Sequence, residues 1–258
     1  MNDIISEVKE GYIVELAKGG KREDGRALDQ YRDVSIHKGV IATAEGSAKV
    51  ELGNTVVMVG VKVSLGEPFA DTPDRGVLTT NAELVPLASP TFESGPPNNV
   101  AVELARVVDR GIREGKVLDL KKLCMTPGEE VWVLFIDVHV LNYDGNLIDA
   151  SALGAMSALY DAVIPASKFD KGEDFNLEIN NCMVTCTSAK VGNAILLDPS
   201  LDEEKVARGR ITIGLDENDD IRSVQKGLTG AFSLDEVKQV LGTSKKSARN
   251  LRKMVMGV

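Results

Sequence analysis

Four carboxylates and two guanidinium groups lie close together in one segment, DPSLDEEKVARGR. The acids follow the apolar run NAILL and are Asp198, Asp202, Glu203 and Glu204. A carboxylate-rich loop after an apolar strand can hold a metal ion or supply a general acid. After Lys205 the segment continues to Arg208 and Arg210, and a guanidinium binds no metal and gives up no proton. The segment is therefore either an active site or the remnant of one.

A second charged set lies on the segment VAVELARVVDRGIREG, residues 100–115. At 100° per residue, one side of the predicted helix is apolar and carries Val100, Leu104, Val107, Val108 and Ile112. The opposite side carries Arg106, Arg110 and Arg113, within about 60° of one another. This stripe is either a solvated face, tied by Glu103–Arg106 and Asp109–Arg113 pairs, or a row of phosphate ligands. Spacing alone favours the solvated face.

The cysteines and the strand histidine do not form a metal-binding pattern. Cys124, Cys182 and Cys186 have no histidine beside them, which argues against zinc and disulfides and fits a reducing interior. Cys182 and Cys186 are four residues apart in a predicted strand, and we expect both in the core. His139 alternates with Asp137 in a strand and is expected to be a hydrogen-bonded structural residue. We predict no metal and no cofactor.

The composition is that of an acidic globular protein. With 258 residues, of which 43% are hydrophobic, the chain can bury a full core. A net charge of −9 and only 4% aromatic residues do not fit a stand-alone nucleic-acid binder, so RNA contact must come from a local patch or a partner. No apolar run approaches the roughly 20 residues of a membrane span. The acidic start, MNDIISEVKEGY, predicts no signal or transit peptide. These features predict a cytoplasmic protein without membrane contact.

The first elements that must position these residues are a helix and a hairpin. A helix over about residues 3–18 is predicted from the helical spacing of Ile5, Val8, Tyr12 and Leu16. Strand-rich sequence then flanks a turn at Gly53–Asn54. A Pro- and Gly-punctuated stretch between Leu65 and Asn99 holds one predicted strand, near Val77–Leu87. The arginine helix follows.

Two further rounds of strands and a helix complete the chain. A strand and an Asp-Gly turn lead to an Ala-rich helix, stopped by Pro165, whose small residues would allow close packing on a sheet: Ala152, Gly154, Ala155, Ser157 and Ala158. Later strands are predicted at Leu177–Thr187, Ala194–Leu197, Ile211–Leu215 and Ile221–Gln225. A C-terminal helix, about residues 234–256, begins at a capping box from Ser233 to Glu236. Its basic residues are expected on a solvated face: Lys245, Lys246, Arg249, Arg252 and Lys253. With no Pro- or Ser-rich linker, we predict one α+β domain over residues 1–258.

Four short motifs occur along the chain in a distinctive order. They are REDGRALDQYR (Arg22–Arg32), GSAKVELGNTVVMVGV (Gly46–Val61), ELARVVDRGIRE and LLDPSLDEEKV. In this order they resemble the RNase PH family of phosphate-dependent exoribonucleases, from about residue 20 onward. With FESGPPNN, the pattern is most similar to the non-catalytic ring subunits of archaeal exosomes. The resemblance implies the family fold, like ribosomal protein S5 domain 2, with duplicated βα units.

The resemblance also predicts a degenerate active site. Phosphorolysis needs donors that hold two anions and acids that bind a metal or protonate the leaving ribose oxygen. Catalytic members have a phosphate-gripping Gly-Ser-Arg triplet where this chain has Gly145, Asn146 and Leu147. Their two acids align with Glu204 and Arg210. The degenerate positions are therefore Asn146, Leu147, Glu204 and Arg210, no catalytic residue remains, and the four loop acids are expected to form a solvated or interface surface.

The implied role is that of a silent subunit in a hexameric ring. Three copies would alternate with three copies of a catalytic RNase PH-like paralogue, shape its active site and help bind single-stranded RNA for 3′→5′ phosphorolytic degradation. S1/KH-type RNA-binding cap subunits would be further partners. Catalytic members hold RNA near the interface between ring neighbours, so the candidate RNA-binding residues are Arg106, Arg110 and Arg113. Of these, only Arg106 is favoured to face RNA.

Two alternatives remain open from the sequence. The chain could be a self-sufficient phosphate-dependent exoribonuclease of RNase PH type, against which the missing Ser-Arg pair and Arg210 argue. It could also be a purely structural ring scaffold without RNA contact, which the acidic net charge favours.

Overall fold

The N-terminal helix forms where the sequence predicts it, but a different face packs. The computed structural model describes residues 4–257, with side chains from residue 9 onward. Helix α1 spans Ile4–Lys18. Among its residues 9–18, Ile13 and Ala17 are buried, whereas Tyr12, predicted to pack, is exposed. The side chains of Ile5 and Val8, the other half of the predicted face, lie outside the described residues.

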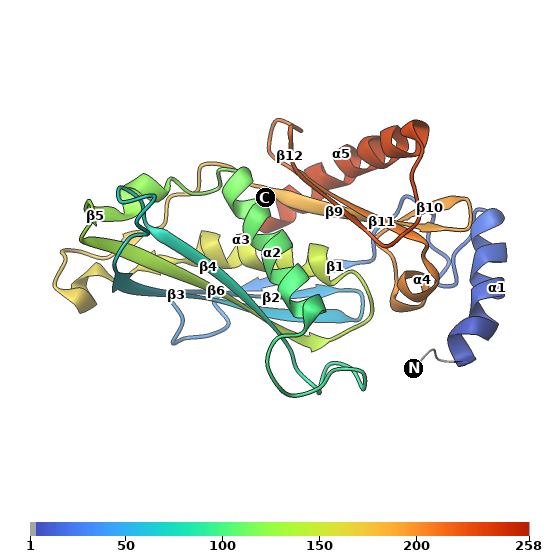
Figure 1. Ribbon diagram of the computed structural model, residues 1–258, viewed down its shortest axis with the longest axis horizontal. Helices are drawn as coiled ribbons and strands as arrows, with labels where there is room; N and C mark the ends of the chain where they lie inside the picture. Colours follow the sequence, from blue (N-terminus) through green and yellow to red (C-terminus); the bar gives the residue numbers. More distant parts are fainter. Residues whose placement is uncertain (1–3, 258) are drawn as a thin grey trace.

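The first sheet has the strand order β1–β2–β3–β6–β4, with β5 paired to β6. Its strands are β1 (Val34–Lys38), β2 (Gly46–Leu52), β3 (Thr55–Gly66), β4 (Val77–Leu84), β5 (Cys124–Thr126) and β6 (Glu130–Asn142). Only β4 and β6 run parallel; the other pairs are antiparallel. The β2–β3 hairpin turns at Gly53–Asn54 as predicted, and Gly53 supplies the positive φ of 56° that the turn needs. Figure 1 shows this sheet, in which β6 lies between β3 and β4.

The second sheet is antiparallel throughout and has the order β10–β9–β11–β12. Its strands are β9 (Val184–Val191), β10 (Ala194–Leu197), β11 (Gly209–Leu215) and β12 (Ile221–Gly227). The strand predicted over Leu177–Thr187 forms only from Val184 onward, because the segment before β9 bonds instead to the residues that follow helix α2 (Asn99–Glu114). There the Asn180 N–H donates to Val117 O, and the Asn181 amide donates to Gly115 O. The short strands β7 (Val163–Ile164) and β8 (Phe175–Asn176) pair only with each other.

Helix α3 (Leu147–Asp161) is the central helix. It contacts β2 and β3 of the first sheet, β9 of the second sheet and helix α5 (Leu234–Met256). Every residue from Leu147 to Leu159 is buried, as expected for a helix that is apolar or small on all sides. A Cβ at Gly154 would lie 2.6 Å from Cγ2 of Val59. The predicted close packing of small residues on the sheet is therefore confirmed.

Helix α2 (Asn99–Glu114) packs against β4 and α3 and also contacts β12. Its N-cap, Asn98, accepts hydrogen bonds from Val100 N and Ala101 N. The apolar face forms as predicted except at Val100, which is 53% exposed; Ala101 is buried in its place. One cause is the position of Val100 in the first turn, directly after the exposed loop of residues 93–98.

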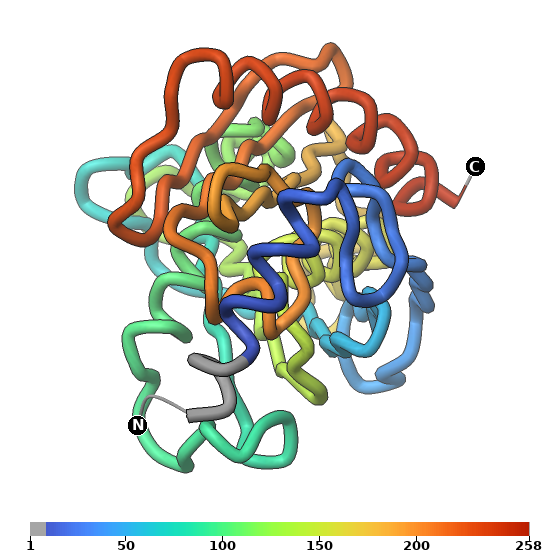
Figure 2. The backbone as a smooth tube through the Cα atoms, turned by 90° about the vertical axis from the view of Figure 1, so that its right-hand side faces the viewer, coloured from blue at the N-terminus to red at the C-terminus, as the bar shows by residue number. Residues whose placement is uncertain are grey.

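The remaining helices cover the second sheet. Helix α5 begins at the predicted capping box, with reciprocal bonds between Ser233 and Glu236. The short helix α4 (Leu201–Val206) has a second capping box, from Ser200 to Glu203. Helix α1 packs against α4 and β9, and Figure 2 shows it crossing this end of the molecule.

One apolar cluster contains residues of both sheets and of α2, α3 and α5. Val59 and Leu134 join it from the first sheet, Ile213 from the second, and Leu104 and Val240 from the helices. Cys182 and Cys186 are buried in the same cluster, as predicted, and burial raises the pKa of the Cys182 thiol to about 11. None of the helices within residues 4–257 combines the length and apolarity needed to cross a bilayer.

Candidate functional site

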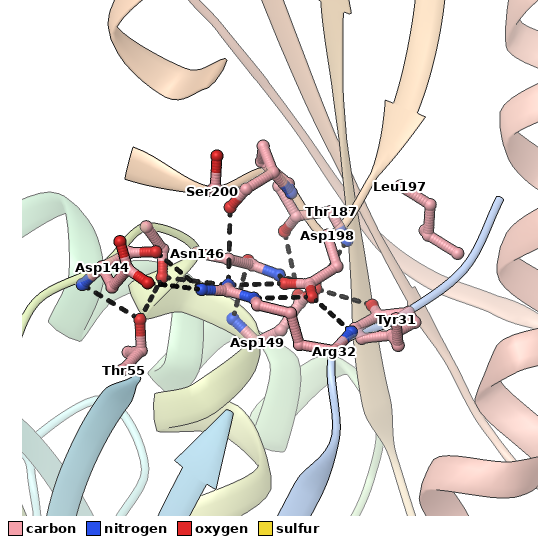
Figure 3. A network of polar contacts seen from close by, with 12 residues as sticks. Tyr31, Arg32, Thr55, Asp144, Asn146, Asp149, Thr187, Leu197, Asp198 and Ser200 are labelled. Carbon is pink, nitrogen blue, oxygen red and sulfur yellow. Dashed lines mark hydrogen bonds and ion pairs between the residues drawn. The ribbon is translucent and has the colours of Figure 1, made fainter. Parts of the chain in front are cut away.

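Asp198 is the centre of a buried ion-pair network that joins the N-terminal motif to the acidic loop. Its side chain is fully buried, and its backbone is left-handed with φ 50°. Arg32 binds it through two bonds, Nε to Oδ2 at 2.9 Å and Nη2 to Oδ1 at 2.8 Å. Arg26 adds a third, Nη1 to Oδ2 at 3.0 Å. Figure 3 shows the Arg32 guanidinium between Asp198 and Asp144, whose backbone oxygen it also contacts.

A second ion pair anchors the start of the same motif. Arg22 is 4% exposed and donates from Nε to Glu203 Oε1 at 2.8 Å and from Nη2 to Glu203 Oε2 at 2.5 Å. Its remaining donors reach the backbone oxygens of Leu197 and Asp198, each at 2.7 Å. Two of the arginines of the motif REDGRALDQYR thus hold both ends of the loop from 197 to 203.

The expectation that the four loop acids form a solvated or interface surface is wrong for Asp198 and Glu203. Both are buried, because Arg22, Arg26 and Arg32 neutralise and hydrogen-bond them, which removes most of the cost of burying a charge. Asp202 is part-exposed and pairs with Lys9 at 2.7 Å. No group of three or more His, Cys, Asp or Glu within the described part of the chain is arranged to hold a metal ion.

The N-terminus of α3 is closed by carboxylates of the protein itself. Asn146 is its N-cap, is buried and has a left-handed backbone with φ 53°. The Asn146 amide donates to Asp198 Oδ1 at 2.7 Å and to Asp149 Oδ2 at 2.9 Å. Its backbone N–H donates to Glu204 Oε1 at 2.9 Å. A helix N-terminus attracts anions, and here the anion that the Asn146 backbone N–H binds is the Glu204 carboxylate.

Glu204 faces this helix end from α4. Its second oxygen accepts from the Tyr143 hydroxyl at 2.9 Å. Burial raises the pKa of Glu204, and the Asn146 N–H, the Tyr143 hydroxyl and the nearby charge of Arg210 oppose that rise. Both oxygens are therefore engaged within the chain. The neighbouring Leu147 is buried and adds no donor from its side chain.

Arg210 points from β11 to α2. Its Nη2 donates to Glu103 Oε1 at 2.6 Å. The predicted Glu103–Arg106 pair does not form, because Glu103 accepts hydrogen bonds from Arg210 and from Gln225 Nε2 instead. The structure thus brings Asn146, Leu147 and Glu204 together, with the Arg210 charge close to Glu204 but its hydrogen bond directed elsewhere.

The three arginines of α2 are exposed on one face, as predicted, but differ in how far they are engaged. Arg113 binds Asp109, confirming that predicted pair at 2.6 Å, and also donates to Leu78 O. Arg110 makes one bond, to Gln225 Oε1 at 3.2 Å. Arg106 has no hydrogen-bond or ion-pair partner among the described residues. Together with Thr80 they line a groove of about 300 Å³.

One buried polar network lies at positions that the sequence reasoning did not single out. Asp149 of α3 is fully buried and accepts bonds from Tyr31, Asn146, Thr185 and Thr187. Burial raises its pKa, and these donors lower it in turn. The available signal was an acid in the first turn of a largely small and apolar helix, which requires buried partners. His139, by contrast, is 43% exposed, and its Nδ1 lies 3.2 Å from a carboxylate oxygen of Glu83.

Comparison with known proteins identifies the family over most of the chain. The model of the 3′ exoribonuclease family, domain 1, matches residues 30–165, and that of domain 2 matches residues 181–247. The exosome complex component Rrp42 of Methanocella arvoryzae is 51% identical over 256 residues, 99% of this chain and 98% of that protein. Rrp42 of Thermoplasma acidophilum is 50% identical, over 97% and 96% of the two chains.

Solved structures agree with this assignment. A chain of the Archaeoglobus fulgidus exosome with RNA bound to the active site superposes with a TM-score of 0.95 and 49% identity, covering 97% of this chain and 99% of that one. A chain of an archaeal exosome core gives a TM-score of 0.91 at 44% identity, with 98% coverage of both. The predicted resemblance and the RNase PH-like fold are confirmed, and the chain belongs to the 3′ exoribonuclease, or RNase PH, family.

Proposed function

We propose that this protein is a non-catalytic subunit of an exosome ring that helps a catalytic neighbour bind and degrade RNA. Three copies alternate with three copies of a catalytic RNase PH-like paralogue in a hexameric ring in the cytoplasm, with S1/KH-type cap subunits as further partners. The substrate is single-stranded RNA, degraded phosphorolytically from its 3′ end. The near-full-length identity of about 50% to proteins named as exosome components supports the assignment to such a complex.

The closed N-terminus of α3 is the observation that argues most directly for a silent subunit. A phosphate bound there would need free N–H groups and a cationic side chain. The Asn146 N–H and amide are already bound by Glu204, Asp149 and Asp198. The adjacent Leu147 has an apolar side chain, and the guanidinium of Arg210 binds Glu103. These contacts support a silent subunit over a self-sufficient phosphorolytic enzyme.

The arginines of α2 argue for RNA contact over a purely structural scaffold. Arg106 has an exposed guanidinium without a partner among the described residues, in a groove shared with Arg110 and Arg113. An unpaired guanidinium at a groove is suited to a phosphate oxygen. Arg106 is therefore the principal RNA contact, followed by Arg110, whereas Arg113 has fewer donors left.

The experiment compares the purified chain with the ring assembled from this chain and its catalytic paralogue. We expect the chain alone to release no nucleoside diphosphate from a poly(A) oligonucleotide in phosphate buffer, and the ring to do so. In the ring, Arg106→Ala should weaken RNA binding by about 1–3 kcal/mol and reduce the salt dependence by about one phosphate contact. Arg113→Ala, at a more engaged arginine of the same helix, is the matched comparison and should have a smaller effect on RNA binding.

Two results would contradict the proposal. Phosphate-dependent shortening of RNA by the chain alone would make it an enzyme in its own right. An assembled Arg106→Ala ring with unchanged RNA affinity and salt dependence would favour the scaffold. The double variant Leu147→Arg and Arg210→Asp is not expected to create activity, because the surrounding contacts do not support the new side chains.

A further inference from the structure

The side chain of Arg210 lies across the second sheet and ends at the arginine helix. Arg210 is on β11, and its partner across the strand pair is Gly227 of β12. A Cβ at Gly227 would lie 2.9 Å from Nη2 and 3.1 Å from Nε of Arg210. The guanidinium therefore lies directly over the bare backbone of Gly227, where any side chain would displace it. From there Nη2 reaches Glu103 Oε1 at 2.6 Å.

A second strand residue attaches the same helix at two points. Gln225 of β12 donates from Nε2 to Glu103 Oε1 at 3.4 Å and accepts from Arg110 Nη1 at 3.2 Å. Glu103 and Arg110 are two helical turns apart, and Arg106 lies between them on the exposed side of α2. The bonds from Arg210 and Gln225 therefore hold α2 on both sides of Arg106, whose guanidinium has no partner among the described residues.

On its polar side, α2 is attached to the second sheet at Glu103 and Arg110. The helix follows the exposed segment of residues 93–98, and its first turn carries the exposed Val100. Its buried residues face β4 and α3. The bonds to β12 and β11 thus supply the polar attachment of α2 to the second sheet.

We propose that Arg210 is a positioning residue for RNA binding: its ion pair with Glu103, made possible by Gly227, holds α2 so that Arg106 and Arg110 are presented to RNA phosphates. The residue at this degenerate position is therefore used, not merely tolerated. This inference rests on the proposed function, because it assigns a cause to the orientation of the RNA-contacting arginines. Arg210 itself touches no RNA in this proposal.

Three single substitutions separate positioning from simple charge effects. Arg210→Gln removes a positive charge, Glu103→Gln removes a negative charge, and Gly227→Ala changes no charge but displaces the Arg210 guanidinium. If only the local charge mattered, Glu103→Gln would tighten RNA binding and Gly227→Ala would have no effect. Positioning predicts that all three weaken it, by roughly two- to tenfold. The Glu103→Gln/Arg210→Gln double variant should bind no worse than either single variant, because both remove the same contact.

The variants are assembled with the catalytic paralogue and tested on a single-stranded poly(A) oligonucleotide. We expect the KM for RNA to rise while kcat changes little, with ring assembly confirmed by mass measurement. Glu114→Gln is the control for lost negative charge, because Glu114 is an exposed acid that lines the same groove as Arg106 but takes no part in the bonds from Arg210 and Gln225. It should bind RNA as tightly as the unchanged ring, or slightly more tightly.

The outcomes distinguish this inference from the proposed function beneath it. If Arg106→Ala weakens binding while Glu103→Gln tightens it, or while Gly227→Ala leaves it unchanged, the positioning role is wrong and the RNA contact stands. Loss of RNA affinity in the three variants without any effect of Arg106→Ala would overturn the inference as stated, because the bonds would then act through another group. If neither set changes affinity, both proposals fail.

Discussion

At the scale of single residues, the buried acids of the loop between β10 and α4 are engaged in ion pairs within the chain. Asp198 has no exposed surface, and its carboxylate accepts five hydrogen bonds. Four come from the side chains of Arg26, Arg32 and Asn146, and the fifth comes from the backbone N–H of Arg32. A carboxylate in such surroundings is more costly to remove than to keep, because Arg26 and Arg32 would each lose a buried counter-charge while staying largely buried themselves.

Replacing the Asp198 carboxylate should therefore cost a large part of the protein's stability. Asp198→Asn keeps a residue that tolerates the left-handed backbone at φ 50°, so that strain does not contribute. We expect the free energy of unfolding to fall by about 3–5 kcal/mol, as for breaking a buried ion pair. Urea-induced unfolding of the purified protein at pH 7 measures this change.

The matched control is in the same loop. Asp202→Asn breaks only part-exposed pairs, with Lys9 and Lys205, and should cost less than about 1 kcal/mol. Equal losses in the two variants would mean that the network around Asp198 adds nothing beyond an ordinary surface ion pair.

The candidate site was predictable from the sequence in its residue types but not in its contacts. The missing donor at Leu147 and the reversed charge at Arg210 follow from the aligned motifs alone. The partner of Arg210 does not, because Glu103 is 107 residues away in the chain and was assigned to its helical neighbour Arg106. Helical spacing predicts contacts within a helix, whereas an ion pair forms with whichever charge the fold brings nearest.

At the scale of elements, strong periodicity and capping residues were the most reliable signals. The helices α2 and α5 and the hairpin β2–β3 form within a residue or two of their predicted bounds. The segment Leu177–Met183 has strand-like composition but bonds to the end of α2, which its sequence cannot reveal. Likewise, Arg252 was expected on a solvated face of α5 and is 5% exposed.

The buried Arg252 connects α5 to the turn before β12, and this connection predicts a pH effect. Arg252 donates to Asp216 O and Asp219 Oδ1, each at 2.7 Å, and Arg249 binds Asp219 Oδ2 at 2.6 Å. Arg249 and Arg252 lower the pKa of Asp219 below its ordinary value. A carboxyl whose pKa is lower in the folded state stabilises the protein above its unfolded pKa of about 3.9, and this contribution is lost as the pH falls through the lowered value.

Asp219→Asn should therefore lower stability at pH 7 by about 1.5–3 kcal/mol, as for lost charge-assisted hydrogen bonds. Asparagine fits the left-handed backbone at φ 61°, so only the charge is removed. The difference between the two proteins should shrink as the pH is lowered below about 4, as followed by urea unfolding across that range. Asp220→Asn, at a 65% exposed side chain, is the control and should leave the pH profile unchanged. A difference that stays constant down to pH 2 would contradict this account.

At the scale of the whole molecule, the two family domains do not have separate cores. The models of domains 1 and 2 match residues 30–165 and 181–247, yet one apolar cluster contains side chains from both parts. Helix α3 belongs to the first part and contacts β9 and α5 of the second as well as β2 and β3. We propose that the chain folds as a single domain, which the sequence suggested only through its lack of a linker.

A single cooperative unit should unfold in one transition, whichever sheet is observed. Trp132, the only tryptophan, lies in β6 and reports on the first sheet by fluorescence. Hydrogen exchange at the amides of β9 and β11 reports on the second sheet.

Leu153→Ala removes a fully buried side chain of α3 and should destabilise the protein by about 2–5 kcal/mol. Because α3 contacts both sheets, the fluorescence midpoint in urea and the exchange-derived stability of the second sheet should fall by the same free energy. Leu234→Ala, at a 70% exposed position of α5, should change both by less than about 0.5 kcal/mol. If Leu153→Ala shifted the fluorescence transition and left exchange in β9 and β11 unaltered, the two halves would be separate folding units despite their common core.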